Sequence, residues 1–265
     1  MTESVWSVKQ SPGRDARPGR QARLLDAAAA LFARFGFDKT SVDDIAKAAG
    51  VSKGAVYLHW PSKVALFDAT LLREGLRLIE DVRARVEADP AGGTLASVYR
   101  HSLVAMGSNP LLLAVYTLDA RVLGDYVHRQ DPAIYARRMI FGEEFVRRMQ
   151  AAHLMRADLE PGTAAYLMGV ISFGLLSIRQ HAPNVPAPSL ETLAAALADL
   201  VQRGLATDDT RAAEAGKAAF GTLVDDTIRL YAHRPEAAPG HGPEPHNHNN
   251  DTSSPTRPSG PHPAG

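Results

Sequence analysis

The stretch from Thr40 to Lys63, TSVDDIAKAAGVSKGAVYLHWPSK, constrains the fold more than any other part of the chain. Ser41 followed by Asp44 three residues later is the capping-box pattern that begins a helix. Gly50 permits the backbone conformation that ends a helix abruptly, and Ser52 can cap the next one. The stretch therefore predicts a helix, a tight turn and a second helix.

The apolar residues of this stretch predict how the two helices cross. Val42, Ile45, Ala46 and Ala49 give the first helix one apolar face. A helix-turn-helix needs a small side chain at the crossing, here Ala46, and an apolar anchor in the second helix, here Val56. The outward residues of the second helix are Ser52, Lys53, Gly54, Ala55, Tyr57 and His59. Such a helix can enter a DNA major groove end-first. A plain helical hairpin inside a bundle is the alternative.

The flanking residues carry a resemblance to a known family. The segments LLDAA, beginning at Leu24, and LFARFGF, beginning at Leu31, precede the motif. Together, residues 20–67 closely resemble the DNA-binding domain of the tetracycline-repressor (TetR) family. The resemblance implies an all-helical dimer with a small N-terminal DNA-reading head and a larger, divergent ligand-binding domain. Leu58 and Trp60 depart from the family pattern, which often has Tyr or His and then Phe; Leu58 puts one polar or phosphate contact in doubt.

The candidate DNA contacts lie in and around the motif. Lys53, Tyr57, His59 and Lys63 are expected to hold phosphates, while the small residues around Gly54 let the helix approach base edges. A basic arm before the first helix adds Arg20. The complete set is Arg20, Ser41, Val42, Ser52, Lys53, Gly54, Ala55, Tyr57, His59 and Lys63.

Charge and composition agree with this interpretation. Residues 1–63 hold ten Lys or Arg against six Asp or Glu, a net charge of +4, although the whole chain is neutral. The basic excess therefore lies where phosphate attraction is needed. Cysteine is absent, which excludes disulfides and cysteine metal ligands.

The N-terminus has no apolar run of a signal peptide, and we expect a cytoplasmic protein. Pro161–Ile178 lacks charged residues but is at the short limit for a membrane span, so we expect a buried interface helix and no membrane partner.

The rest of the chain predicts helices separated by proline and glycine breaks. A long helix from Ser62 to about Ala88 would link head and body. Further helices are expected near 94–107, 110–127, 131–154, 160–181, 189–206 and 209–232. The predicted divisions are a disordered basic arm at 1–18, a DNA-binding domain at 19–67, an effector and dimerisation domain at 68–206, an additional helix at 207–233 and a disordered tail at 234–265. The fold class is all-α.

The resemblance implies a dimer interface and an effector pocket. Helices 160–181 and 189–206 would pair with those of a second copy through Leu167, Ile171, Leu175, Ile178, Leu193, Leu197, Leu200 and Val201; an intramolecular core is the alternative for each residue. The candidate effector contacts are His101, Met106, Tyr116, Asp119, Tyr126, Phe145, Met168 and Phe173.

Catalytic motifs are absent from the sequence. We find no phosphate-binding glycine loop, nucleophile elbow or zinc-type His-Glu-x-x-His pattern. Histidines in the tail match no recognised metal site, so neither a metal nor a cofactor is expected.

The predicted protein is a homodimeric repressor that binds a palindromic operator in double-stranded DNA and is released by a small-molecule effector. An activator on the same fold and a helical protein-interaction module are the alternatives.

Overall fold

A computed structural model describes residues 19–129, 133–182, 184, 186–207 and 213–232. Over these ranges the secondary structure is helical, apart from an isolated bridge between Met155 and Ala206, and the predicted all-α class is confirmed. The helices are α1 (Arg20–Lys39), α2 (Val42–Ala49), α3 (Lys53–Tyr57), α4 (Lys63–Ala88), α5 (Leu95–Ser108), α6 (Pro110–Thr117), α7 (Ala120–Leu123), the 3-10 helix η1 (Gly124–Arg129), α8 (Ala133–Ala151), α9 (Pro161–His181), α10 (Leu190–Leu205) and α11 (Ala213–Ala232).

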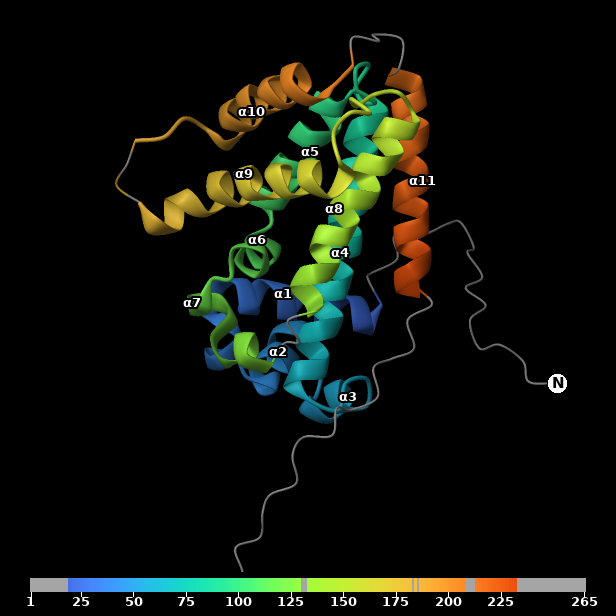
Figure 1. Cartoon of the computed structure of the whole chain (residues 1–265). Helices are drawn as coiled ribbons and strands as arrows, with labels where there is room; N and C mark the ends of the chain where they lie inside the picture. Colours follow the sequence, from blue (N-terminus) through green and yellow to red (C-terminus); the bar gives the residue numbers. More distant parts are fainter. Residues whose placement is uncertain (1–18, 130–132, 183, 185, 208–212, 233–265) are drawn as a thin grey trace, which may run out of the picture.

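The helices α1, α2 and α3 form a compact head at one end of the molecule (Figure 1). Its core contains the fully buried residues Leu24, Phe32 and Ile45. The unbroken helix α4 leaves the head at Lys63 and runs into the body, as the sequence predicts. Ser62 caps its first turn by accepting a hydrogen bond from the Ala65 amide at 3.1 Å.

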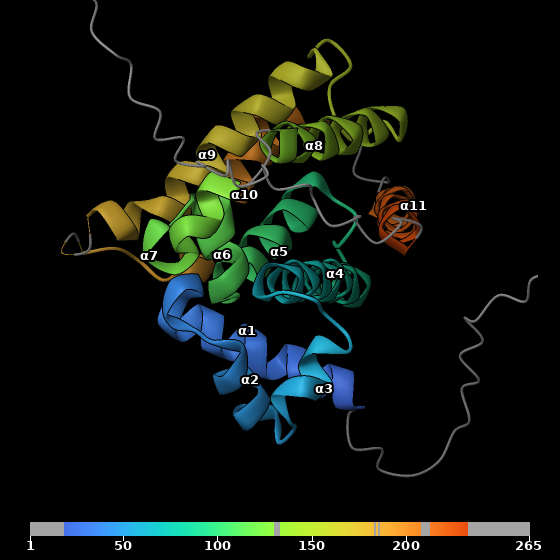
Figure 2. The same ribbon diagram turned by 90° about the horizontal axis from the view of Figure 1, so that it is seen from below.

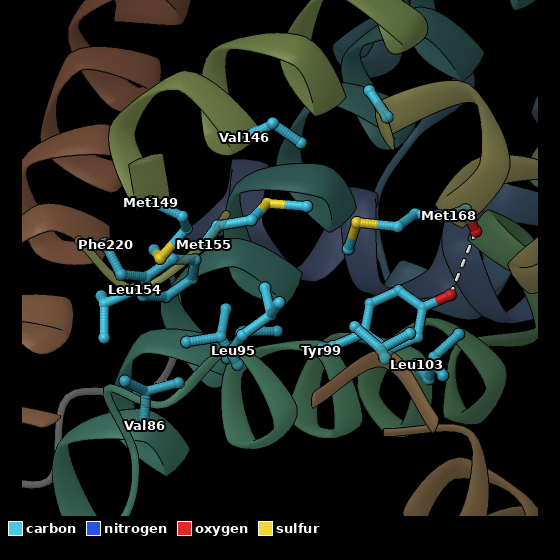
Figure 3. Packing of buried hydrophobic residues seen from close by; sticks show 14 of the residues in the cluster. Val86, Leu95, Tyr99, Leu103, Val146, Met149, Leu154, Met155, Met168 and Phe220 are labelled. Carbon is cyan, nitrogen blue, oxygen red and sulfur yellow. Dashed lines mark hydrogen bonds between the residues drawn. The ribbon is translucent and has the colours of Figure 1, made fainter. Parts of the chain in front are cut away.

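The body has a second hydrophobic core, built by α4, α5, α8, α9, α10 and α11. Figure 3 shows Met149 of α8, Met168 of α9 and the rings of Tyr99 in α5 and Phe220 in α11 packed in this core. Tyr99 takes its hydroxyl into this core, where it donates to the Met168 carbonyl at 3.0 Å and lies 2.6 Å from the Ser172 hydroxyl. Burial raises the pKa of the Tyr99 phenol. The hydroxyl thus joins α5 to α9 inside an apolar environment.

Three outer helices complete the body. Figure 1 shows α9 and α10 crossing it, with α10 on the side away from the head. In Figure 2, α11 lies at the edge of the body across from α9 and α10, next to α4 and α8. Ion pairs from Arg83 to Asp225 (3.0 Å) and from Arg148 to Asp226 (2.7 Å) tie α11 to both neighbours.

The sequence prediction was wrong about one helix. The single helix expected at 110–127 is divided into α6, α7 and η1, because Leu118 adopts a left-handed conformation (φ 56°) and Asp119 caps α7. Within the bounds of α1 the backbone leaves the helical conformation at Gly36 (φ 82°, ψ 167°), and a short helical segment follows to Lys39. The remaining predicted helices agree with the structure to within a few residues.

Candidate nucleic-acid interface

The turn between α2 and α3 is built by the local signals that the sequence contains. Ser41 and Asp44 form the reciprocal capping box, with both backbone-to-side-chain distances at 3.1 Å. The Asp44 carboxylate accepts hydrogen bonds from the Ser41 hydroxyl (2.6 Å) and from the Ser41 amide, and these, in that order, lower the pKa of Asp44. Gly50 ends α2 in the left-handed conformation (φ 67°), and Ser52 accepts the Ala55 amide at 3.2 Å to begin α3. The predicted helix-turn-helix is therefore present.

The buried side of α3 is fixed by two apolar anchors. Val56 packs into the head core against α2, where the small Ala46 is almost fully buried. Trp60 is also buried, so it packs as the resemblance implies. These contacts set the rotation of α3, and the opposite side of the helix faces solvent.

The solvent side of α3 carries most of the predicted DNA contacts. The exposed residues are Ser52, Lys53, Gly54, Tyr57 and His59, with Ala55 half-buried. Within the described part of the chain, Lys53 forms no ion pair, so its ammonium is available to a phosphate. The surface combines a cation, two aromatic groups and small residues, which suits a helix that approaches DNA closely.

The other predicted contacts lie around this surface in different situations. Arg20 is exposed at the start of α1. Ser41 is exposed but its hydroxyl is engaged by Asp44 at 2.6 Å. The Val42 side chain is buried, so a DNA contact from this residue would use its backbone amide at the start of α2. Lys63 lies 4.3 Å from the centre of the Phe37 ring and donates to the Asp38 carbonyl at 3.4 Å, so a phosphate must compete with these partners.

A second attachment joins the head to the body besides α4. Phe32, Phe37 and Phe67 pack with Tyr126 of η1, with ring centres 4.4 to 6.0 Å apart for the pairs in contact. The Tyr126 hydroxyl donates to Asp68 of α4 at 2.5 Å. Figure 2 shows α6 and α7 lying against α1. The head core is thus completed by residues of the body.

Close backbone contacts strengthen this attachment at the end of α1. Gly124 has a positive φ of 50°, and a Cβ atom there would overlap the Asp38 carboxylate. The neighbouring Asp125 amide donates to that carboxylate at 3.2 Å. No local pattern in the sequence indicates this docking, since the pairing of Asp38 with Gly124 spans more than eighty residues.

The structure does not gather the predicted effector contacts into one cavity. Met168 and, in part, Met106 and Phe145 are packed in the body core, and Tyr126 belongs to the head attachment. Tyr116 donates to the Gly169 carbonyl at 3.4 Å and lies beside the half-exposed Phe173. Asp119 lines a cavity of about 280 Å³ with Arg121, Gln180 and His181, and its hydrogen bonds from Arg121 lower its pKa.

His101, the remaining predicted effector contact, belongs to a polar cluster around Asp89. The Asp89 carboxylate accepts from Ser97 at 2.6 Å and Arg100 at 3.0 Å, and lies 3.0 Å from His101 Nε2. The Ser97 hydroxyl, followed by the Ala91 amide and His101, lowers the pKa of Asp89 to about 2. This cluster holds the reversal between α4 and α5.

A larger cavity of about 460 Å³ lies between head and body. It is lined by Ala29, Ala30, Ala33, Glu74, Arg77, Leu78, Asp81, Ala105, Ser108, Asn109, Pro110 and Leu111. Three alanines of α1 form one wall, and α4 with the α5–α6 turn forms the other. Arg77 reaches across to Asp26 of α1 at 2.9 Å, and Glu74 accepts from Asn109 at 3.0 Å.

The predicted dimer residues divide into exposed and buried groups. Leu167, Ile171 and Ile178 of α9 and Leu200 of α10 are exposed, while Leu175 and Leu193 are half-buried. Leu197 and Val201 instead pack in the body core. Tyr166, Val170 and Phe173 add exposed apolar surface to α9 that the predicted set omits.

By length and composition alone, Pro161–Ile178 is the one helical segment of the described ranges that could cross a membrane.

Comparisons with known proteins identify the family. Residues 24–70 match the model of the bacterial regulatory proteins of the tetR family. The transcriptional repressor KstR of Mycolicibacterium smegmatis is 33% identical over 155 residues, which cover 54% of this chain and 74% of the relative. The chain belongs to the tetR family. It is a DNA-binding transcriptional regulator and not an enzyme.

Two further matches extend over the body of this tetR-family regulator. The regulator AcrR of Shigella flexneri is 30% identical over 182 residues, covering 64% of this chain and 82% of the relative. A transcriptional regulator from Streptomyces coelicolor superposes with a TM-score of 0.52 at 25% identity, covering 71% of this chain and 98% of the other. The body therefore shares the family's helical fold as well as its head.

Proposed function

We propose that this chain is a homodimeric repressor that binds a palindromic operator and is released by a small-molecule effector. The exposed face of α3 carries the proposal, since it presents Lys53, Tyr57 and His59 around small residues that allow close approach to DNA. Two copies related by a two-fold axis would place their α3 helices about 34 Å apart, or a multiple of this, in successive major grooves. The relative KstR, named a repressor, supports the sign of regulation.

The dimer is proposed to form through the exposed apolar side chains of α9 and α10. These helices lie away from α3, so a second copy bound there leaves both DNA-reading surfaces free (Figure 1). A contiguous apolar surface that is exposed on one chain commonly marks a protein interface. The self-complementary contact of two equal surfaces also gives the symmetry that a palindrome requires.

The effector is proposed to act by changing how the head sits on the body. Its volume places the 460 Å³ cavity in the range of small-molecule sites, and its walls come from α1 on one side and α4–α6 on the other. A ligand that prefers one head orientation shifts the population toward it by its differential affinity. The eight residues expected from sequence remain predictions, of which only Asp119 lines either of these two cavities.

The first experiment is fluorescence anisotropy with duplex DNA from upstream of the chain's own gene, titrated with salt. We expect binding that weakens steeply with salt and prefers the native duplex over a scrambled one of equal length. Lys53→Ala should weaken binding to both duplexes and lower the salt slope by about one unit for each phosphate that the lysine neutralises. Tyr57→Ala should also weaken binding.

A matched control removes the same charge far from the head. Lys217→Ala, in α11, should leave both the affinity and the salt slope unchanged. Parent-like binding by both Lys53→Ala and Tyr57→Ala would contradict the assignment of α3 as the reading helix. A reporter gene behind the bound duplex separates a repressor from an activator, because only the activator raises expression when the protein is present.

A further inference from the structure

Leu58 is the most exposed large apolar side chain among the described residues, at 84% exposure. It follows directly on α3, and its amide donates to the Gly54 carbonyl at 3.2 Å, so it continues the helix by one residue. Its neighbours Tyr57 and His59 are exposed as well. The side chain therefore lies within the DNA-reading surface and outside the head core.

The helix geometry directs Leu58 toward the part of α3 that is free of side chains. Side chains of a helix lean toward its N-terminus, over the residue four positions earlier. For Leu58 that residue is Gly54, and apart from its chain neighbours and the nearby backbone of the helix, no atom lies within 4 Å of the position that a Cβ would take there. Leu58 is thus an exposed apolar side chain on a helix whose residue four positions earlier has no side chain.

A leucine cannot contact a phosphate as the polar residues around it can, because it has neither a donor nor a charge. Single exposed leucines are common on protein surfaces and by themselves need no explanation. This one, however, lies between the exposed Tyr57 and His59 in the chain, whose polar groups suit phosphates, on the surface proposed to enter the groove. The major-groove feature that an apolar side chain can recognise is the C5-methyl group of thymine.

We propose that Leu58 determines part of the operator sequence by packing against a thymine methyl group in each half-site. This inference rests on the proposed function, since it requires α3 to enter the major groove. It adds a base-specific contact to a surface whose other exposed residues are short or suited to phosphates. A thymine at one position of each half-site should therefore be preferred over cytosine or adenine at that position.

The test begins by selecting bound duplexes from a random-sequence pool with the parent protein and with Leu58→Ala. The thymines of the parent's selected sequence are then replaced one at a time by deoxyuridine, which removes only the methyl group. At one thymine per half-site we expect the parent to bind about fourfold more weakly, the factor given by burial of one methyl-sized group. Leu58→Ala should lose both the preference for that thymine and the deoxyuridine effect.

Leu230→Ala is the matched control, because Leu230 is 62% exposed and belongs to α11, which is no part of the head. It should select the parent's sequence and keep the full deoxyuridine effect. Equal deoxyuridine effects in the parent and Leu58→Ala, or no effect at any thymine in the parent, would overturn the inference while leaving the proposed function standing. Failure of the parent to enrich any sequence would overturn the proposed function and this inference with it.

Discussion

At the scale of single residues, Asp89 shows how one carboxylate organises a chain reversal. It receives hydrogen bonds from the hydroxyl of Ser97, the amide of Ala91 and the guanidinium of Arg100, all within 3.0 Å. The Ser97 hydroxyl first, and then the Ala91 amide and His101, favour the ionised form and lower the pKa of Asp89 from 3.8 to about 2. The carboxylate therefore stabilises the folded state wherever it is ionised in both states.

The sign of the pH dependence follows from this lowered pKa. The contribution of Asp89 is fully present above the unfolded pKa of 3.8 and is lost as the pH falls through about 2. Asp89→Asn should lower the free energy of unfolding at pH 7 by on the order of 2 kcal/mol, and the difference from the parent should narrow below pH 4. Urea unfolding at pH 7 and pH 3 measures both values.

Asp199→Asn provides the control for this measurement. Asp199 pairs with Arg203 at 2.9 Å on the exposed surface of α10. Such pairs contribute little, so the substitution should change the free energy of unfolding by less than about 1 kcal/mol. An Asp89→Asn variant as stable as the parent at pH 7 would show that the cluster around Asp89 does not stabilise the fold.

At the scale of elements, the helix-turn-helix could be predicted because its signals are local. Ser41 with Asp44, Gly50 and Ser52 each act within four residues, so the sequence alone locates α2, the turn and α3. The division of α6, α7 and η1 could not be predicted, because a left-handed Leu118 has no sequence signal. The contact of Gly124 with Asp38 could not be predicted either, because it arises from tertiary packing between residues far apart in the chain.

The docking of η1 on the head gives a prediction at Gly124. Gly124→Ala places a Cβ on the Asp38 carboxylate and adds the cost of a positive φ, so it should destabilise the protein by more than about 1 kcal/mol. Hydrogen exchange should accelerate at the end of α1. Gly221→Ala, in the interior of α11 with no atom within 4 Å of the added Cβ, should instead leave stability unchanged or raise it by up to about 1 kcal/mol.

Equal stability of Gly124→Ala and the parent would mean that η1 can leave the head without cost. The attachment would then contribute nothing to the position of the head, and α4 would be its sole support. Hydrogen exchange distinguishes a loosened attachment from a stabilising change elsewhere in the protein. Only a loosened attachment exposes the backbone amides near Lys39.

At the scale of the whole molecule, the proposed dimer depends on which faces of α9 and α10 are exposed. The sequence identified both helices as apolar but could not separate Leu200, which is exposed, from Leu197 and Val201, which are buried. Periodicity places these residues on neighbouring faces, and only the packing against α5 shows which face is covered. The residues proposed to pair between copies therefore depend on tertiary structure, whereas the two helices proposed for the interface could be chosen from the sequence.

Leu200→Asp tests the proposed dimer. Leu200 is 66% exposed, so a charge there should be tolerated by the monomer but not by an apolar interface. We expect the molar mass from light scattering to fall to that of one chain and operator binding to weaken strongly. Leu230→Asp, at a leucine of 62% exposure on α11, should remain dimeric. A dimeric Leu200→Asp protein would place the interface elsewhere.

The core shared by head and body has a consequence for exchanging DNA-reading modules among regulators of this family. Leu111, Leu123 and Tyr126 of the body are buried in the same cluster as Phe32, Phe37 and Phe67. A chimera that receives only residues 19–67 from this chain would leave those rings facing a foreign surface. Transplanting α6, α7 and η1 together with the head keeps the cluster whole, so the functional unit for such grafting is discontinuous along the chain.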